Sequence, residues 1–403
     1  MRNNQLTNQR NLWNLRWNPP FVYLFIGLFA FACRKGGVDR KELKDFQQVN
    51  LVANSSEYHP VTVDSTLING FGIAWSPNGI AWVNSVGGHV SELYKADGSI
   101  VRPGVRIPTD RDNANGLPCG IVFSGNKKFN LPNGPAFFIF SGFDGIVSAW
   151  NGGDTAMRIR HKVRANDSYT GLAIGAAGGR DFIYGANFGA KKIDVWDTAF
   201  SPVEMSFKDL YLPGGYSPYN IQAVGDRLFV MYAVLGADGH GVAGAGKGIV
   251  SEFRMDGTFV RRFASNGTLN IPWGVSAAPA SFLEGRDLSV NGGKSGGGSK
   301  AGGESGGVGG SGGGYGGSGG NGGVGGLDSV ILVGSFGDGH INVFSRNGDF
   351  LGQLQSHNHT IVIDGLWALS FPPASAGIDP GRLYFLAGPG KETDGIFGYL
   401  IKQ

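Results

Sequence analysis

The sequence predicts an all-β fold, a six-bladed β-propeller of four-stranded antiparallel sheets. Three observations lead to this prediction: a unit of short apolar strands and Gly or Asp turns recurs six times, the copies lie about 50 residues apart, and 71 of the 403 residues are glycine. Strands this short need packing neighbours on both faces. Six sheets closed into a ring supply those neighbours and leave no exposed edge.

The units align on a small residue in the first strand of each. In chain order these anchors are Gly72 (NGFGIAW), Gly120 (PCGIVF), Gly171 (YTGLAI), Asn220 (PYNIQAV), Gly274 (PWGVSAA) and Ala368 (LWALSF), and the steps between them are 48, 51, 49, 54 and 94 residues. The third unit shows the internal pattern, with Leu172 and Ile174 alternating on a first strand and a Gly178-Gly179 turn after it. We expect the propeller over residues 49–403, with a strand near 49–53 completing the blade that the C-terminal strand begins.

The long last step has a visible cause, a glycine tract. Residues 291–326 contain 22 glycines and almost no apolar side chains. Such a tract buries too little surface to offset the entropic cost of ordering its backbone. We therefore predict a disordered Gly-rich insertion between two strands of the fifth blade, tolerated because loop-closure cost grows slowly with length.

The N-terminus predicts export. Residues 1–20 carry three arginines and no acid, and 21–32 form an apolar run that ends at Cys33. A membrane-spanning helix needs about 20 apolar residues, so this run is too short to span but suits a secretory signal. The segment AFAC resembles the lipobox of a bacterial lipoprotein. We expect 1–32 to be the signal peptide, Cys33 to be lipidated and 33–48 to be a membrane tether; the alternative is an ordinary cleaved signal with a chance cysteine.

Charge and cysteine content exclude two classes of protein. The three leader arginines account for the whole net charge of +3, so the remaining chain has a formal charge of zero. A neutral chain without blocks of Lys and Arg has no charged surface that would bind nucleic acid. With Cys33 lipidated, Cys119 is the only thiol left, and no intrachain disulfide can form. We expect an exported monomer in the bacterial cell envelope, held at the outer membrane by its acyl anchor.

Several segments resemble a known group of propellers. The segments DFIYGANFGAKKIDVWD and SVILVGSFGDGHINVF resemble the repeat pattern of NHL and streptogramin-lyase-like propellers. Together with NGFGIAWSPNG, LPGGYSPYNIQ and DGLWALSF, they also resemble a family of bacterial secreted propellers that is known only by a numbered domain. The resemblance covers roughly residues 49–400 apart from the glycine tract. It implies a six-bladed, exported protein and no particular activity.

A site is expected where loops gather at the mouth of the axial channel. In propellers the loops before the innermost strands and the loops between second and third strands share one face. We predict a ligand-binding pocket there, with rings for apolar contact and polar groups for orientation, made of Tyr219, Trp273, Trp367, Asn187 and Asp364. The competing interpretation is structural, because an aromatic residue beside the anchor can simply pack between blades.

Two function classes remain open. The first is a binding or scaffold module that presents its loops to a glycan, a peptide or an envelope protein. The second is a metal-dependent enzyme of the lactonase or lyase kind, in which a divalent cation polarises a carbonyl. That enzyme needs Asn84, Asn187 and Asp364 to converge on one metal ion. We favour binding, because a fold alone does not establish an activity.

Overall fold

The computed structural model describes residues 40–284 and 330–403. The signal peptide expected over 1–32, the lipidation site Cys33 and the Gly-rich insertion expected over 291–326 lie outside the described residues. Within the described part, no helix is long and apolar enough to cross a bilayer. The first described element is a 3-10 turn, η1 (Arg40–Leu43), whose Leu43 is buried against the last blades, so the end of the expected tether is folded.

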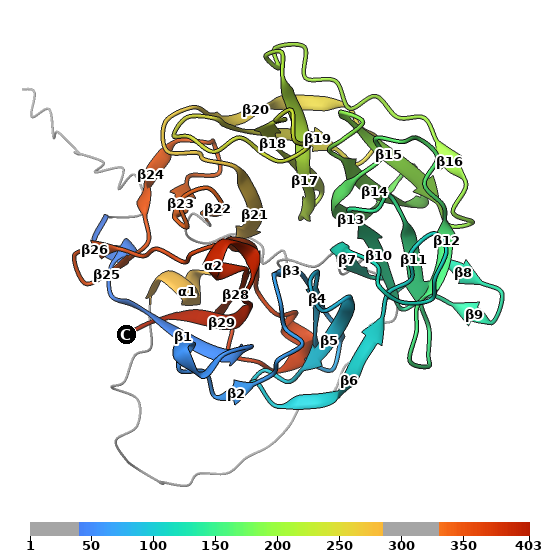
Figure 1. Cartoon of the computed structure of the whole chain (residues 1–403). Coiled ribbons are helices and arrows are strands. Elements are labelled where there is room, and N and C mark those ends of the chain that lie inside the picture. Colours follow the sequence, from blue (N-terminus) through green and yellow to red (C-terminus); the bar gives the residue numbers. More distant parts are fainter. Residues whose placement is uncertain (1–39, 285–329) are drawn as a thin grey trace, which may run out of the picture. The chain divides into compact units, whose positions relative to one another are not determined.

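Six antiparallel sheets form a closed ring, as predicted (Figure 1). Numbered in chain order, each of the blades 1–6 has an inner strand next to the axis, and these are β3 (Gly70–Trp75), β7 (Pro118–Phe123), β13 (Tyr169–Ala177), β17 (Tyr216–Val224), β21 (Pro272–Ala277) and β27 (Leu366–Ser370). The second strands are β4 (Ala81–Ser85), β10 (Phe138–Gly142), β14 (Arg180–Asn187), β18 (Arg227–Val234), β22 (Ile331–Ser335) and β28 (Leu383–Ala387).

The outer half of each blade is built in the same way. The third strands are β5 (Val90–Tyr94), β11 (Val147–Trp150), β15 (Lys192–Asp197), β19 (Gly248–Arg254), β23 (Ile341–Phe344) and β29 (Ile396–Lys402). The outermost strands are β6 (Ile100–Arg106), β12 (Met157–Arg160), β16 (Pro202–Val203), β20 (Phe259–Ser265), β24 (Phe350–Gln353) and β1 (Phe46–Ala53).

Short elements fill the connections. They are β2 (Thr62–Val63), which pairs in parallel with β1, the hairpins β8 (Asn130–Leu131) with β9 (Gly134–Pro135) and β25 (Gln355–Ser356) with β26 (His359–Thr360), the 3-10 turns η2 (Ser56–Tyr58) and η4 (Ala374–Ala376), and the helices α1 (Ala280–Glu284) and α2 (Pro389–Glu392). The segment that contains the Gly-rich tract joins α1 to β22, so it interrupts blade 5 between its first and second strands as the sequence predicted.

The N-terminal strand closes the ring. β1 pairs antiparallel with β29 from Phe46 opposite Lys402 to Ala53 opposite Ile396, so blade 6 combines both ends of the folded chain. This confirms the predicted closure, and β1 begins at Phe46, three residues earlier than the expected boundary at Val49. Pairing of the two ends removes a strand edge that would otherwise be exposed.

The anchors are small because neighbouring blades meet there. A Cβ on Gly72 would lie 2.3 Å from the Cys119 carbonyl oxygen of blade 2, and a Cβ on Gly120 would lie 2.5 Å from the Leu172 nitrogen of blade 3. Where blade 4 has Asn220 instead of glycine, its amide donates a 2.7 Å hydrogen bond to the Trp273 carbonyl of blade 5. The repeated small residue therefore marks the contact between successive inner strands.

Candidate functional site

Every inner strand carries a β-bulge beside its anchor. In all six blades the register with the second strand slips there, so that two residues of the inner strand oppose one of its partner. A bulge re-aims a side chain and increases local twist. The bulged residues that precede the anchors are Phe71, Cys119, Thr170, Tyr219, Trp273 and Trp367.

Four rings from these bulges form an aromatic plug across the axis: Phe71, Tyr219, Trp273 and Trp367. Phe71 of blade 1 stacks on Trp367 at 3.8 Å between ring centroids and meets Trp273 of blade 5 edge-on at 5.2 Å. Tyr219 of blade 4 lies 6.0 Å from Trp367 of blade 6. Because the Phe71–Trp273 and Tyr219–Trp367 contacts join blades that are not neighbours, the rings fill the centre. The structure therefore brings together the three aromatic residues named from the sequence, Tyr219, Trp273 and Trp367.

A second apolar layer covers the plug on the mouth side. In blades 1 to 5 the residue after the second strand is apolar, and its backbone N–H donates to a carbonyl just before or at the start of the inner strand; these residues are Val86, Phe143, Phe188, Leu235 and Phe336. Phe336 stacks on Trp367 at 3.8 Å and Phe143 meets Phe71 edge-on at 5.3 Å. Phe143, Leu235 and Phe336 are only half-buried, and we call these three residues the apolar floor.

Blade 6 places an acidic rim beside this floor. Asn69, in the left-handed region at φ 48°, accepts a 2.9 Å hydrogen bond from Trp367 Nε1 and donates a 2.8 Å bond to Glu392 Oε2. Asp364, which is exposed, accepts from the Gly390 backbone N–H at 3.1 Å and so fixes the loop that carries Glu392. Two carboxylates therefore stand at the edge of the plug, one linked to it through a single amide side chain.

The Tyr219 hydroxyl has no hydrogen-bond partner among the residues that the structure describes. The side chain is 5% exposed, and burial first, then the negative charge of Glu392, raises its pKa well above the usual range. The phenol therefore stays protonated and can donate. Buried tyrosine hydroxyls usually find a partner, so a free one beside Glu392 marks a place where a ligand acceptor would be stabilised.

Asp144, next to Phe143 in the chain, is partly buried. Its Oδ1 accepts from the Ile146 N–H at 3.3 Å, and its enclosed Oδ2 has no partner among the described residues. Burial raises the pKa of this carboxyl, although backbone N–H groups and Lys162 partly offset the effect. Nearby Cys119 is fully buried, and burial raises the pKa of its thiol. Neither group is placed to act as a nucleophile on a ligand at the mouth.

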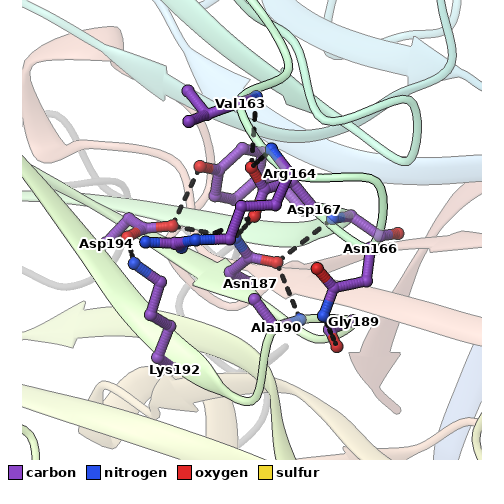
Figure 2. A network of polar contacts seen from close by, with 11 residues as sticks. Val163, Arg164, Asn166, Asp167, Asn187, Gly189, Ala190, Lys192 and Asp194 are labelled. Atoms are coloured by element: carbon purple, nitrogen blue, oxygen red, sulfur yellow. Dashed lines mark hydrogen bonds and ion pairs between the residues drawn. The ribbon is translucent and has the colours of Figure 1, made fainter.

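Asn187 belongs to a separate polar network at the corner of blade 3 (Figure 2). Its amide nitrogen donates to Asp167 Oδ1 at 2.9 Å and to Asp194 Oδ2 at 2.8 Å. Its oxygen accepts from the N–H groups of Ser168 and Ala190, each at 3.1 Å. All four hydrogen-bonding positions of the amide are therefore in use, and the side chain is 0% exposed. In this conformation Asn187 holds the blade together and has no group left for a ligand.

The same network sets the charge state of Asp167. Burial alone would raise the pKa of this carboxyl, but hydrogen bonds from Asn187, from the Arg164 and Val163 N–H groups, and the charge of Arg164 outweigh it and hold the pKa below its usual range. Asp194 also accepts a 2.9 Å bond from the Tyr169 hydroxyl and pairs with Lys192. Asn187 thus bridges the carboxyl groups of Asp167 and Asp194, which enclose the corner.

The three residues considered for a metal have different partners. Asn84 is 0% exposed and donates to the carbonyls of Cys119 and Gly120, each at 3.2 Å, while Asn187 and Asp364 have the partners given above. No hydrogen bond or shared partner links them. In the described ranges, 40–284 and 330–403, no group of three or more His, Cys, Asp or Glu residues is arranged to hold a metal ion.

The axial channel below the plug is narrow. All six inner strands line it, through residues such as Gly72, Gly120, Leu172, Gln222 and Leu369, and the space for water within it is about 20 Å³. That volume holds about one water molecule. A ligand of the size of a sugar or a peptide side chain therefore does not fit inside this channel.

Sequence reasoning did not identify the apolar floor or Glu392. The signal for the floor was present, because a single apolar residue follows the second strand in GFDG, ANFG, VLGA and SFGD at matching places in the units. Glu392 carried no comparable signal. It ends the short helical turn α2 in the connection between β28 and β29 of blade 6, where Lys391 and Glu392 both take positive φ.

Comparison with known proteins identifies relatives of this chain, and the relatives are themselves uncharacterized. No family model matches the sequence. Uncharacterized protein R648 of Acanthamoeba polyphaga mimivirus is 27% identical over 374 residues, which are 88% of this chain and 80% of that protein. Uncharacterized protein L690 of the same virus is 32% identical over 245 residues, 58% of this chain and 52% of that protein. These viral relatives give no support to the expected bacterial and secreted character.

Solved structures with a similar course of the chain share little sequence identity with it. A streptogramin B lyase structure superposes with a TM-score of 0.47 at 10% identity, covering 88% of this chain and 96% of the lyase. A gluconolactonase from Xanthomonas campestris gives a TM-score of 0.44 at 14% identity, covering 83% of this chain and 86% of that one. Likenesses at this level carry no argument about what this chain does.

Proposed function

We propose that this protein is a binding module that holds a peptide segment at the mouth of the propeller axis. The observation that carries the proposal is the apolar floor of Phe143, Leu235 and Phe336, half-exposed and fixed on a buried aromatic plug. Aromatic rings locked by packing provide contact area at little entropic cost. A ligand side chain of apolar character would cover these rings.

The polar groups at the edge of the floor favour a peptide over the glycan and the whole envelope protein that we also considered. The free Tyr219 hydroxyl is a donor, and the Glu392 and Asp364 carboxylates are acceptors with negative charge. A peptide offers carbonyl oxygens to the first and N–H groups to the second, and a Lys or Arg side chain adds charge complementarity. The ligand is therefore a segment with an apolar residue next to a basic one.

Binding is better supported than the metal-dependent lactonase or lyase activity considered above. That activity needs ligands converging on one ion, whereas all four hydrogen-bonding positions of Asn187 are in use and Asn84 is fully buried, with Nδ2 bound to the carbonyls of Cys119 and Gly120 and Oδ1 without a partner among the described residues. No specific observation favours the enzyme.

We further propose that the module works as an exported monomer, attached to the bacterial outer membrane through an acyl chain on Cys33. The AFAC segment after an apolar run supports this location. The acyl chain is the only attachment in this proposal, so a Cys33→Ser variant, which lacks the acceptor thiol, should lose lipid labelling and move to the soluble fraction. Membrane association that persists in the variant would contradict the anchor.

Selection from a library of random octapeptides displayed on phage tests the function. Wild-type protein should enrich peptides that carry an aromatic or aliphatic residue beside Lys or Arg, and the double variant F336A/E392Q should not. Equal enrichment on both proteins, or no enrichment on the wild type, would refute a peptide site at the mouth.

A further inference from the structure

A second cavity lies away from the axis, on the seam between blades 3 and 4. It has a volume of about 300 Å³ and is bounded by the start of β15, the segment 207–212 that leads into blade 4, and the strands β17 and β18. This volume is at the lower end of the range of small-molecule sites, which begins near 300 Å³. None of its lining residues belongs to the floor or the acidic rim.

The walls are apolar. Ile193 lies on the blade 3 side, Phe207, Leu210 and Leu212 come from the connecting segment, and Pro218 lies on β17. Leu210 is 83% exposed, which is unusual for a leucine at the edge of a cavity. A ligand with an apolar body would cover this side chain and remove its surface from water.

The base of the cavity presents a free hydroxyl. Tyr232 of β18 is 3% exposed and lines the cavity, and its hydroxyl has no hydrogen-bond partner among the described residues. Burial and the nearby Asp209 raise the pKa of this phenol well above its usual range, while Arg262 lowers it slightly, so the hydroxyl stays protonated. No hydrogen bond joins it to Asp209, whose oxygens receive bonds from Ser251, Arg262 and the Tyr211 N–H.

The opening carries uncompensated positive charge. Lys191 and Lys208 line the cavity, are exposed and have no ion-pair partner in the part of the chain that the structure describes. The third lysine, Lys192, is neutralised by Asp194, as Asp209 is by Arg262. Two free ammonium groups and one free phenol thus surround an apolar space, and the local charge balance is +2.

We propose that this seam binds a monocarboxylate with an apolar body, such as a medium-chain fatty acid. The hydrocarbon lies against Ile193, Phe207 and Leu210, and the carboxylate accepts hydrogen bonds from the Tyr232 hydroxyl and the ammonium groups of Lys191 and Lys208. Charge-assisted hydrogen bonds of this kind are stronger than neutral ones and give the site its preference for an anion. The proposal does not depend on peptide binding at the mouth.

Calorimetric titration of the full chain with octanoate tests the site, with octan-1-ol and octylamine as probes of equal length. Octanoate should bind with a dissociation constant of about 1 mM or tighter, given its size, and the alcohol and the amine at least about tenfold more weakly. Equal affinity for octanoate and octan-1-ol would overturn the proposal, because the cavity would then select only for hydrocarbon.

Substitutions that spare the fold locate the binding. K191Q/K208Q changes only exposed side chains, and Y232F removes a hydroxyl without any partner to lose, so both variants should melt as the wild type does. Each should weaken octanoate binding about tenfold, whereas K95Q, on a distant turn of blade 1, and Y219F, at the mouth, should leave it unchanged. Wild-type octanoate affinity in both K191Q/K208Q and Y232F would place the ligand elsewhere and refute the assignment.

Discussion

Trp367 and Phe336 stack with ring planes 14° from parallel and centroids 3.8 Å apart, although they come from different blades. Trp367 is a bulged residue of the inner strand of blade 6, and Phe336 follows the second strand of blade 5. The stack joins the plug that closes the axis to the floor that faces the mouth. The floor therefore rests on the packed centre of the ring, which suits a recognition surface.

The close approach of neighbouring inner strands predicts the effect of Gly171→Ala. The added methyl group would lie 1.9 Å from Asn220 Oδ1 and 2.9 Å from Asn220 Cα, and that amide is held by bonds to Trp273 and Ile221. We expect a loss of about 2 to 3 kcal/mol in the free energy of unfolding, measured by urea denaturation. Gly214→Ala, with no atom within 4 Å, is the control and should change stability by less than about 0.5 kcal/mol. Equal effects would contradict the role of the anchors.

The network around Asn187 predicts a structural rather than a binding phenotype for Asn187→Ala. The change leaves Asp167 and Asp194 without their shared donor in a buried corner. The expected loss of stability is about 2 to 4 kcal/mol, with peptide affinity unchanged in the folded protein. Asn113→Ala, at an exposed loop position, serves as the control. A stable N187A variant that had lost peptide binding would show that Asn187 contacts the ligand after all.

Closure by β1 predicts a cooperative effect of truncation. Removing residues 1–54 deletes the strand that pairs with β29, including its buried side chains Phe46 and Val52, and exposes that edge of blade 6. The melting temperature should fall by more than about 10 °C, whereas removal of residues 1–39 alone should leave it within a few degrees. Similar melting curves for the two truncations would show that the ring does not need its closing strand.

The enclosed carboxyl of Asp144 predicts a pH-dependent gain from Asp144→Asn. Burial raises the pKa of this group in the folded state, so ionisation is penalised there, and stability falls as the pH rises from its unfolded-state value of about 3.9 through the folded value. The variant has no such charge. Denaturation at pH 7 should find it more stable than the wild type, and the difference should shrink towards pH 4. A variant less stable at pH 7 would mean that the charge has a partner.

The ring could be predicted from the sequence because the anchor spacing reports a physical constraint. A Cβ would clash with the next blade at Gly72, Gly120, Gly171 and Gly274, so the constraint recurs in four of the six units and can be read without a structure. The grouping of Tyr219, Trp273 and Trp367 followed from their places beside the anchors.

The remaining features of the mouth depend on contacts between residues far apart in sequence. Asn69 meets Glu392 across 323 positions, and Asn187 meets Asp167 across 20, and no local pattern encodes either pair. The direction of a side chain at a bulge is likewise set by the ring as a whole. For that reason the sequence could predict that the aromatic rings lie near the axis, but it could not predict that they close the axial channel.

The most direct test of a peptide site at the mouth is the affinity of a phage-selected peptide for the wild type and for Tyr219→Phe, measured by calorimetry. The Tyr219 hydroxyl has no partner within the described fold, so its removal should leave the melting temperature unchanged. The account predicts that the variant binds the peptide about tenfold more weakly. Tyr232→Phe, which changes a free phenol elsewhere in blade 4, should bind it as the wild type does. Undiminished binding by Tyr219→Phe, or an equal loss in both variants, would contradict the account.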